Sequence, residues 1–309
     1  MRLRARLLEA TRRFFAGAGV LEVETPILGA CTATDPALAS LQAVVGGGAS
    51  IAGRRFYLQT SPELALKRLL AAYRTPVYQL GKAFRDGERG SLHNPEFTLL
   101  EWYRPGWDHI ALMGEVEALL DTLLGTGPGR RVTYRDVFLE GTGLDALRAP
   151  TAEIARAAQA HGLAVEASTA SRDECLDFLF ATRVQAALAG SRLVFVHDFP
   201  ASQAALARIR PGDPPVAERF EAFVDGVELA NGYHELSDPA EQRARCEADL
   251  ARRRARGLEE PPMDERFLAA LGHGLPDCAG VALGFDRLVM ITAGLRRIDG
   301  VMAFPLERA

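Results

Sequence analysis

The chain has 309 residues, of which 48% are hydrophobic and 25% are charged, and its formal net charge is −4. This length and composition suit one large α/β core or two small ones, and do not require a second domain. Proteins that bind nucleic acid usually present a basic surface, so the net charge disfavours a tRNA partner. No run approaches the ~20 apolar residues of a membrane span, and the Arg-rich start lacks the apolar core of a secretory signal. We therefore expect a cytoplasmic protein with no membrane partner.

Apolar periodicity predicts an alternation of helices and strands along the chain. Helices are expected over residues 4–15, 62–72, 109–124, 151–161 and 172–188. Strands are expected over 77–85, 95–103, 193–199 and on both sides of the dipeptide Asp225-Gly226. Residues 130–190 are read as a helical insertion between catalytic strands, to which we assign no chemistry.

The hairpin over 77–103 carries a pattern suited to a nucleotide. Its second strand places Phe97, Glu101 and Tyr103 on one face by period two. Around the polar loop, Arg85 can reach a phosphate, His93 can approach a phosphate tail, and Phe97 can lie against a flat base. The pattern indicates ATP.

The second hairpin offers a cation site. A two-residue type I′ turn at Asp225-Gly226 pairs Phe223 with Glu228 and sets Glu221 diagonal to Glu228. Diagonal neighbours on one face lie roughly 7–8 Å apart at Cα. Two carboxylates at this separation can share a hard cation such as Mg²⁺, which also bridges ATP phosphates.

Strict alternation in this hairpin conflicts with a single site. It would turn Asn231, Tyr233 and Glu235 to the face opposite Glu228. A β-bulge would re-aim these side chains, and Gly232 is the residue at which we expect it.

Two later segments carry arginines of interest, one at the start of a helix and one in a basic run. The apolar strand after Gly280 runs into a helix near Phe285, so Arg287 falls in a first helical turn, where its charge suits a polyphosphate. The basic run over 252–256 is expected to be a solvated face at a helix C-terminus, with partner docking as the alternative.

The cysteines and most histidines show no spacing typical of a metal site. The cysteines form no Cys-x-x-Cys pair and are expected to be reduced packing residues: Cys31, Cys175, Cys246 and Cys278. Four scattered histidines are expected to be structural: His161, His197, His234 and His273. A pocket role is considered only for His234.

Three segments together resemble a known family. Residues 14–28, 81–103 and 280–290 stand in the order and spacing of motifs 1, 2 and 3 of class II aminoacyl-tRNA synthetases. Residues 60–70 and 228–238 resemble, more closely, the catalytic core of lysyl-tRNA synthetases.

One difference from lysyl-tRNA synthetases narrows the resemblance. Such an enzyme would carry an anticodon-binding domain of ~100 residues before this core, whereas motif 1 begins here within the first twenty residues. With the runs at 101–105 and 199–203, the chain resembles the bacterial elongation factor P lysine ligase family, a truncated synthetase paralogue.

The resemblance implies a fold and an activity. The fold would be α+β, a class II synthetase-like antiparallel sheet flanked by helices, in a single catalytic domain over 1–309 without an N-terminal anticodon-binding domain. The enzyme would use ATP and Mg²⁺ to activate (R)-β-lysine or lysine as an adenylate. It would transfer this group to a lysine of elongation factor P and form a homodimer through motif 1.

The resemblance also implies roles for individual residues. The implied ATP-binding residues are Arg85, Glu88, His93, Asn94, Phe97, Glu221, Glu228 and Arg287. Of these, Arg85 and Arg287 would also be catalytic, and Glu221 and Glu228 would also hold the metal. The implied substrate-binding residues are Ser61, Glu63, Glu101, Tyr103, Asn231, Tyr233, Glu235, Ala282 and Gly284. Asn231 with Arg85 would hold the amino-acid carboxylate, Glu63 the backbone-side ammonium, and Glu235 with Tyr103 the distal ammonium.

Two positions depart from the family pattern. Gly87 stands where many class II enzymes have an acidic residue that reads adenine, so either Glu88 or the backbone is expected to make this contact. Ala282 stands where lysyl-tRNA synthetases usually have Gly, which predicts a preference for β-lysine over α-lysine.

Other functions stay open at this point. A tRNA-charging ligase or an asparagine-synthetase-like paralogue would use the same adenylate step. A regulatory paralogue would have lost catalysis, but it has no chemical need for Arg85, Glu221, Glu228, Asn231 and Arg287 together.

Overall fold

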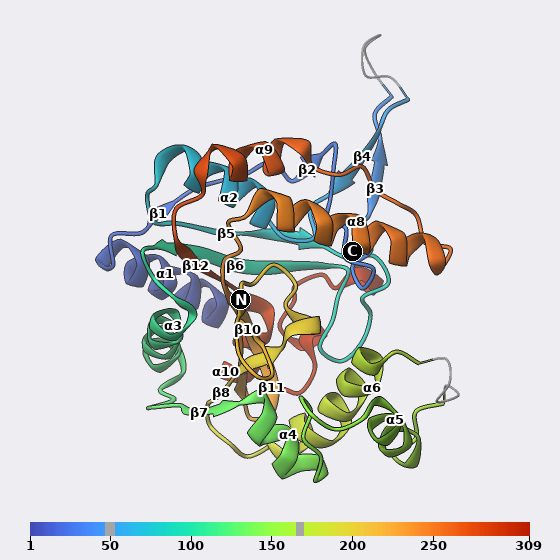
Figure 1. The fold of residues 1–309 in the computed structure, drawn as a ribbon. Helices are drawn as coiled ribbons and strands as arrows, with labels where there is room; N and C mark the ends of the chain where they lie inside the picture. Colours follow the sequence, from blue (N-terminus) through green and yellow to red (C-terminus); the bar gives the residue numbers. More distant parts are fainter. Residues whose placement is uncertain (47–52, 165–169) are drawn as a thin grey trace. The chain divides into compact units, whose positions relative to one another are not determined.

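The computed structural model describes residues 1–46, 53–164 and 170–309 (Figure 1). These residues form two compact units, one of Met1–Gly106 with Leu236–Ala309 and one of Trp107–Glu235. Residues 165–169, inside the expected helical insertion, lie outside the described part. Among the described helices, none combines the length and apolar composition needed to cross a membrane. That the two units form a single catalytic domain stays a prediction.

The first unit contains a mainly antiparallel sheet. Its strands β1, β5, β6 and β12 are neighbours in that order, with β1 parallel to β5 and the other pairs antiparallel. The strands of this unit are β1 (Leu21–Glu22), β2 (Leu28–Gly29), β3 (Gln42–Val44), β4 (Arg55–Leu58), β5 (Val77–Phe84), β6 (Glu96–Pro105) and β12 (Cys278–Gly284). Its helices are α1 (Arg2–Gly17), α2 (Glu63–Tyr73), α8 (Pro239–Ala255), α9 (Glu265–Gly274) and α10 (Phe285–Thr292). Strands β2, β4 and β3 form a small separate sheet.

Alternation along β5 and β6 sends large side chains to both faces of this sheet. On one face Phe15 of α1 stacks on Tyr78 at 4.5 Å between ring centroids and meets Trp102 edge-on at 5.2 Å. On the other face Tyr103 packs in the cluster formed by α2 and α9, which includes Leu70. Figure 1 shows α2 and α9 on one side of β5 and β6, and α1 and α10 on the other. Both faces of β6 are thus covered, and its residues 98–103 are all buried.

The start of α10 is fixed by a buried carboxylate. Asp286 pairs with Arg4 of α1 and accepts a hydrogen bond of 2.6 Å from the backbone N–H of Thr98 in β6. The helix therefore begins at Phe285 and has Arg287 in its first turn, as the sequence predicts.

The second unit carries the helical insertion and the second hairpin. Its strands β11, β10, β8 and β7 are neighbours in that order, with β9 pairing β10. Their bounds are β7 (Arg130–Thr133), β8 (Val194–Pro200), β9 (Ile209–Arg210), β10 (Val216–Val224) and β11 (Val227–His234). The helices are α3 (His109–Leu124), α4 (Tyr134–Thr142), α5 (Thr151–Ala160), α6 (Arg172–Leu179) and α7 (Gln185–Ala187), with a π-turn over Phe180–Val184. The helix expected over 172–188 is thus interrupted by a π-turn.

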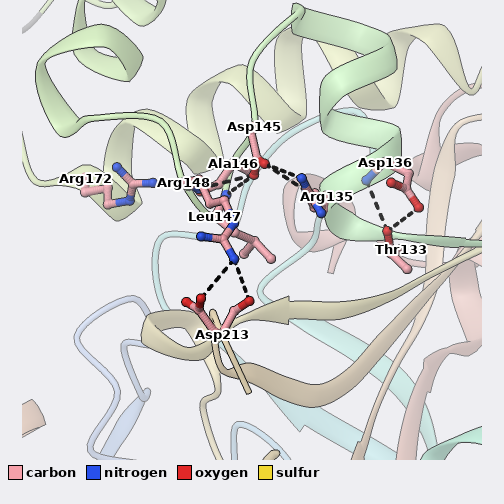
Figure 2. Close-up of polar contacts among 9 residues, drawn as sticks. All are labelled: Thr133, Arg135, Asp136, Asp145, Ala146, Leu147, Arg148, Arg172 and Asp213. Carbon is pink, nitrogen blue, oxygen red and sulfur yellow. Dashed lines mark hydrogen bonds and ion pairs between the residues drawn. The ribbon is translucent and has the colours of Figure 1, made fainter. Parts of the chain in front are cut away.

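Polar contacts fix the loops of the insertion (Figure 2). The Thr133 hydroxyl caps α4 by accepting the backbone N–H of Asp136 at 3.1 Å, and Arg135 pairs with Asp145 at 2.8 Å. Arg172, at the start of α6, donates to the carbonyl of Ala146 at 2.8 Å. These bonds hold the connection from α4 to α6 over an apolar core that includes residues of both helices.

The turn of the second hairpin has the predicted type, but the bulge lies elsewhere. Asp225 and Gly226 have φ of 51° and 75°, as a type I′ turn requires. The register shifts between Ala222 and Phe223, which leaves Leu229 as the extra residue of β11. Pairing across Gly232 is regular, so the expectation of a bulge at Gly232 is wrong. The shift still has the expected effect, because it brings Glu228, Asn231 and Tyr233 to one face.

The basic run at the end of α8 is only in part a solvated face. Arg252 is exposed, whereas Arg253 is buried at 6% exposure. Arg253 donates to the carbonyls of Glu259 at 2.6 Å, Asp35 at 2.6 Å and Leu38 at 3.0 Å. The expectation of solvation is therefore wrong for Arg253, because carbonyls far away in sequence enclose its guanidinium.

Candidate functional site

A buried carboxylate in the first unit is held by two hydroxyl groups. Glu101 of β6 is 2% exposed and accepts hydrogen bonds from the Ser61 hydroxyl at 2.6 Å and the Tyr103 hydroxyl at 2.8 Å. Burial raises the pKa of the Glu101 carboxyl to about 7, and the charge of Glu63 adds to this shift. A carboxylate in this setting gains much from a cation that arrives with a ligand.

The neighbouring strand leaves room beside this carboxylate. Ala282 of β12 is the direct cross-strand partner of Glu101, and Gly280 is the partner of Tyr103. Directly opposed residues have their Cβ atoms about 4.5–5.5 Å apart, so the Ala282 methyl lies on the Glu101 face. Ala282 is thus positioned to restrict what approaches Glu101.

Glu63 already has a cationic neighbour in the structure. Lys67, one turn further along α2, is fully buried, and its Nζ lies 2.6 Å from Glu63 Oε1. Glu63 also stands in the first turn of α2, where the helix dipole favours an acidic residue. Its role towards a substrate ammonium stays a prediction, and any such ammonium would share Glu63 with Lys67.

The predicted phosphate-binding side chains gather in the same unit. Arg85 lies over the Phe97 ring at 5.1 Å and pairs with Glu88 at 3.2 Å. His93 Nε2 lies 2.8 Å from Arg287 Nη2 and 3.9 Å from Glu88 Oε2. The Glu88 carboxylate therefore stands between Arg85 and His93, which is a position suited to an anion.

Two other predicted residues, Asn94 and Gly284, have structural tasks, and so does Gly87. The Asn94 amide donates to the Glu96 carbonyl at 2.6 Å and accepts the Leu306 N–H at 3.1 Å, so backbone groups occupy both of its ends. Gly284 ends β12 and begins α10 as the N-cap. Gly87 has a φ of 74°, which side-chain-bearing residues rarely adopt, and this explains why no acidic residue stands there.

Arg219 organises the carboxylates of the second unit and was missed in the sequence. It pairs with Glu221 at 2.6 Å, donates to Asn231 Oδ1 at 3.2 Å and lies over the Phe199 ring at 4.4 Å. The Asn231 amide in turn donates to the Tyr233 hydroxyl at 3.0 Å. Period two along β10 puts Arg219 on the face of Glu221, so the argument that found Glu221 could have found it too.

These groups line a cavity of about 150 Å³ within the second unit. Both predicted metal ligands, Glu221 and Glu228, line it beside Arg219 and Asp177. Its full lining is Tyr134, Asp177, Phe180, Ala181, Gln185, Phe199, Gln203, Arg219, Glu221, Phe223 and Glu228. Burial raises the pKa of Asp177, in α6, to about 6. The insertion, to which the sequence assigned no chemistry, thus supplies part of this polar cavity.

The carboxylate pair fits a divalent cation. Burial raises the pKa of Glu221 to about 7, and the charge of Glu228 contributes in the same direction although Arg219 opposes it. The turn pairs Phe223 with Glu228 as expected, so the two carboxylates share one face. Two carboxylates on one cavity wall suit Mg²⁺, which prefers oxygen ligands.

The remaining predicted residue, Glu235, follows β11. It is 1% exposed, bridges to Ala207, and accepts the Arg208 Nε at its carbonyl at 2.8 Å. Its role towards a distal ammonium stays a prediction, as do the other assigned roles. Each unit brings its own predicted residues together, those around Glu101 and Arg287 in the first and those around Arg219 in the second.

Comparison with known proteins gives a consistent result over the whole chain. The family described as tRNA synthetases class II (D, K and N) matches residues 1–308. A Vibrio cholerae protein named elongation factor P--(R)-beta-lysine ligase is 49% identical over 310 residues, covering 100% of this chain and 96% of its own. A Proteus mirabilis protein of the same name is 48% identical over 308 residues, covering 99% and 94%. The resemblance and the α+β fold expected from the sequence are confirmed, and the chain belongs to the class II (D, K and N) tRNA synthetase family.

Proposed function

We propose that this protein is an ATP-dependent, AMP-forming ligase that activates (R)-β-lysine, or lysine, and transfers it to a lysine side chain of elongation factor P. The relatives carry this activity in their names, and they align with this chain from end to end. A cytoplasmic location is part of the proposal.

The observation that carries the proposal is the environment of Glu101. Its two oxygens accept hydroxyl hydrogen bonds, which orient the carboxylate, while burial and Glu63 keep its pKa near 7. A ligand ammonium would supply the charge that stabilises the ionised form. This favours a substrate that places an ammonium group beside Glu101.

The first step is activation of the amino acid. An oxygen of its carboxylate attacks the α-phosphorus of ATP, the bond to the β-phosphate oxygen breaks, and pyrophosphate leaves with the electron pair. In-line displacement of this kind needs positioning and charge neutralisation rather than an enzyme nucleophile. Arg85 is assigned to the α-phosphate, and Arg287 with His93 to the outer phosphates.

The metal has one part in this step. Bound by Glu221 and Glu228, Mg²⁺ would neutralise charge on the phosphate oxygens. Arg219 holds Glu221 at 2.6 Å and so fixes one of the two carboxylates in position.

The second step is transfer. The neutral amine of the acceptor lysine attacks the carbonyl carbon of the adenylate, the bond to the phosphate oxygen breaks, and AMP leaves. An amide forms, and the amine loses its proton to solvent or to AMP. Because the amide requires an amine, a tRNA hydroxyl acceptor would give an ester instead.

The direct experiment separates the protein acceptor from tRNA. The purified chain is incubated with ATP, labelled lysine or (R)-β-lysine, and either elongation factor P or total tRNA. We expect label on elongation factor P that withstands alkali, as an amide does. Alkali-labile label on tRNA alone would contradict the proposed acceptor and favour a charging enzyme.

A second experiment tests the phosphate-binding cluster. Arg287→Ala removes a charge-assisted contact to the leaving phosphates, so pyrophosphate exchange should fall by about 10²–10³-fold. Arg252→Ala is the matched control, because Arg252 is exposed on α8 and surface ion pairs contribute little. Arg253 is unsuitable as the control, because it is buried. Equal losses in both variants would contradict the role of Arg287.

The homodimer through motif 1 is a further part of the proposal. Three apolar side chains of this segment are more than a third exposed, Leu21, Ile27 and Leu28. Clustered exposure of this kind is typical of an interface. Light scattering of the purified protein should give twice the 33.5 kDa chain mass, and Leu21→Glu should shift it towards the monomer.

A further inference from the structure

The second unit places histidines and carboxylates together on the hairpin face away from the Glu221–Glu228 pair. Glu218 of β10 stands directly before Arg219, and His234 of β11 directly after Tyr233, and Arg219 is the cross-strand partner of Tyr233. By alternation both side chains lie opposite the face of Arg219 and Glu221. Helix α3 packs against both strands and begins at His109.

The donor atoms of His109, Glu218 and His234 converge. One donor atom from each residue lies within 4.8 Å of the other two. His234 Nδ1 is 2.6 Å from Glu218 Oε2, and the two imidazole rings face one another with centroids 6.4 Å apart and an interplanar angle of 19°. Residues far apart in sequence thus present two nitrogens and one carboxylate to a common point.

The burial of His109 indicates that this point is built for a ligand. His109 is 2% exposed, and within the described residues neither of its ring nitrogens has a hydrogen-bond partner. Leaving a buried polar nitrogen without a hydrogen bond is unfavourable by about 1–3 kcal/mol, so native structures seldom contain one without a further purpose. Glu218 and His234 retain 17% and 12% side-chain exposure, which leaves a path from solvent.

The surroundings resemble the outer shell of metal sites. Asp198 Oδ1 lies 3.7 Å from His109 Nε2, and a carboxylate behind a ligating imidazole is the usual arrangement. Arg210 pairs with Asp198 at 2.7 Å and lies 3.7 Å from Glu218 Oε1, which orients both carboxylates. Two carboxylates against one guanidinium leave a net negative charge around the two imidazole rings.

We propose that His109, Glu218 and His234 form a binding site for a divalent transition metal, with Zn²⁺ the best match. Two imidazoles and one carboxylate are a common zinc ligand set, whereas Mg²⁺ prefers oxygen ligands alone. Zinc–nitrogen bonds of about 2.0 Å in a tetrahedron need donors about 3.3 Å apart, so the side chains turn inward by roughly 1 Å on binding. The metal replaces the His234–Glu218 hydrogen bond.

Such a metal would join the start of α3 to the paired strands β10 and β11. On their other face these strands carry Arg219, Glu221 and Asn231. No sequence motif points to this site, because the three ligands are separated by 109 and 16 positions. The inference does not depend on the proposed function, since zinc binding is measured without ATP or amino acid.

The test is a titration of the chelator-treated full chain with ZnCl₂ alone, followed by calorimetry. We expect one Zn²⁺ per chain and a higher melting temperature with zinc. Co²⁺ should give visible absorption bands of a tetrahedral site. His109→Phe keeps a buried ring but removes a ligand, and should weaken zinc binding at least a hundredfold. His161→Phe, at an exposed histidine of the same unit, should leave zinc binding unchanged.

Two further variants keep the test decisive. Glu218→Gln preserves the shape of the side chain but removes its charge, so it should also weaken zinc binding, whether or not His109→Phe folds. Glu228→Gln should bind zinc as the unaltered protein does, because Glu228 lies on the opposite face. Absence of binding at about 100 µM free Zn²⁺, or equal binding in His109→Phe, would overturn the proposal.

Discussion

Glu101 in the first unit is buried and Glu221 in the second is partly buried, and the pKa of both carboxyls is raised to about 7, yet their partners differ. Glu101 accepts hydrogen bonds from two neutral hydroxyls, those of Ser61 and Tyr103. Glu221 pairs with the guanidinium of Arg219 and faces the competing charge of Glu228. The same shift therefore arises in two environments that suit different cations.

The difference indicates what each carboxylate is able to bind. Hydroxyl partners orient Glu101 but leave its charge uncompensated, so a monovalent ammonium completes the centre. In the second unit the charge of Arg219 already balances that of Glu221. The charge of Glu228 needs a further cation, and a divalent ion shared with phosphates provides it. Four experiments test this distinction.

The largest effect is expected from Glu101→Gln. Removing one partner of a buried charge pair costs about 2–5 kcal/mol, so kcat/KM for the amino acid should fall at least about thirtyfold. The Mg²⁺ requirement should stay unchanged. The measurement is the lysine-dependent exchange of labelled pyrophosphate into ATP, over a range of lysine and Mg²⁺ concentrations.

Glu96→Gln serves as the control for this variant. Glu96 lies on the same strand, but it is exposed and pairs only at the surface with Lys82. It should behave as the unaltered protein. If Glu101→Gln changed the Mg²⁺ requirement and spared amino-acid affinity, the two centres would have been assigned the wrong way round.

The next effect is expected from Glu221→Gln and from Glu228→Gln. Either change leaves one carboxylate for the cation, and we expect the Mg²⁺ concentration for half-maximal exchange to rise about tenfold, the equivalent of ~1.4 kcal/mol. Affinity for lysine in the absence of ATP should be unaltered. Glu140→Gln, at an exposed position of the same unit, is the control. Wild-type Mg²⁺ dependence in both variants would remove the pair from the metal site.

The raised pKa of Glu101 predicts a pH dependence of opposite sign for stability and binding. Between pH 4.5 and 7 the folded protein holds a proton on Glu101 that the unfolded chain has released, so this group makes stability fall as pH rises through that window. A lysine ammonium favours the ionised form, so lysine affinity should rise about tenfold from pH 6 to pH 8. Calorimetry in buffers of different ionisation enthalpy should detect the released proton, and Glu101→Gln should abolish it.

The smallest effect is expected from Ala282→Gly. The Ala282 methyl lies opposite Glu101 and would crowd an α-ammonium more than a β-ammonium. A misplaced methyl costs ~1–3 kcal/mol, so its removal should shift the kcat/KM ratio towards α-lysine by about tenfold. Ala279→Gly, on the opposite face of β12, controls for loosening of the strand. An unchanged ratio would make Ala282 a packing residue only.

Local sequence signals predicted much of this fold. The helix over 109–124 has the expected bounds, because Asp108 caps it and Gly125 ends it in the left-handed conformation. The type I′ turn at Asp225-Gly226 follows from residue types that tolerate positive φ. Arg287 occupies the predicted first turn of α10.

Features that depend on distant partners were not predictable. The position of the bulge depends on how β10 and β11 pair, and alternation within one strand showed only that a bulge was needed. Arg253 has the sequence setting of a surface residue, and only the carbonyls of Asp35 and Leu38 reveal that it is enclosed. His109 and His234 converge through tertiary packing, which no spacing rule describes.

The extra residue in β11 reconciles an odd spacing with a shared face. Glu228 and Asn231 are three positions apart, which strict alternation would send to opposite faces, and the unpaired Leu229 restores the shared face. Removal of Leu229 would leave a separation of two positions, for which regular pairing keeps Asn231 and Tyr233 on the side of Glu221 and His234 on the side of Glu218. Loss of the bulge without loss of a residue would instead disperse both groups of side chains. The number of residues in this segment and the presence of the bulge are therefore coupled, so that one can change only together with the other.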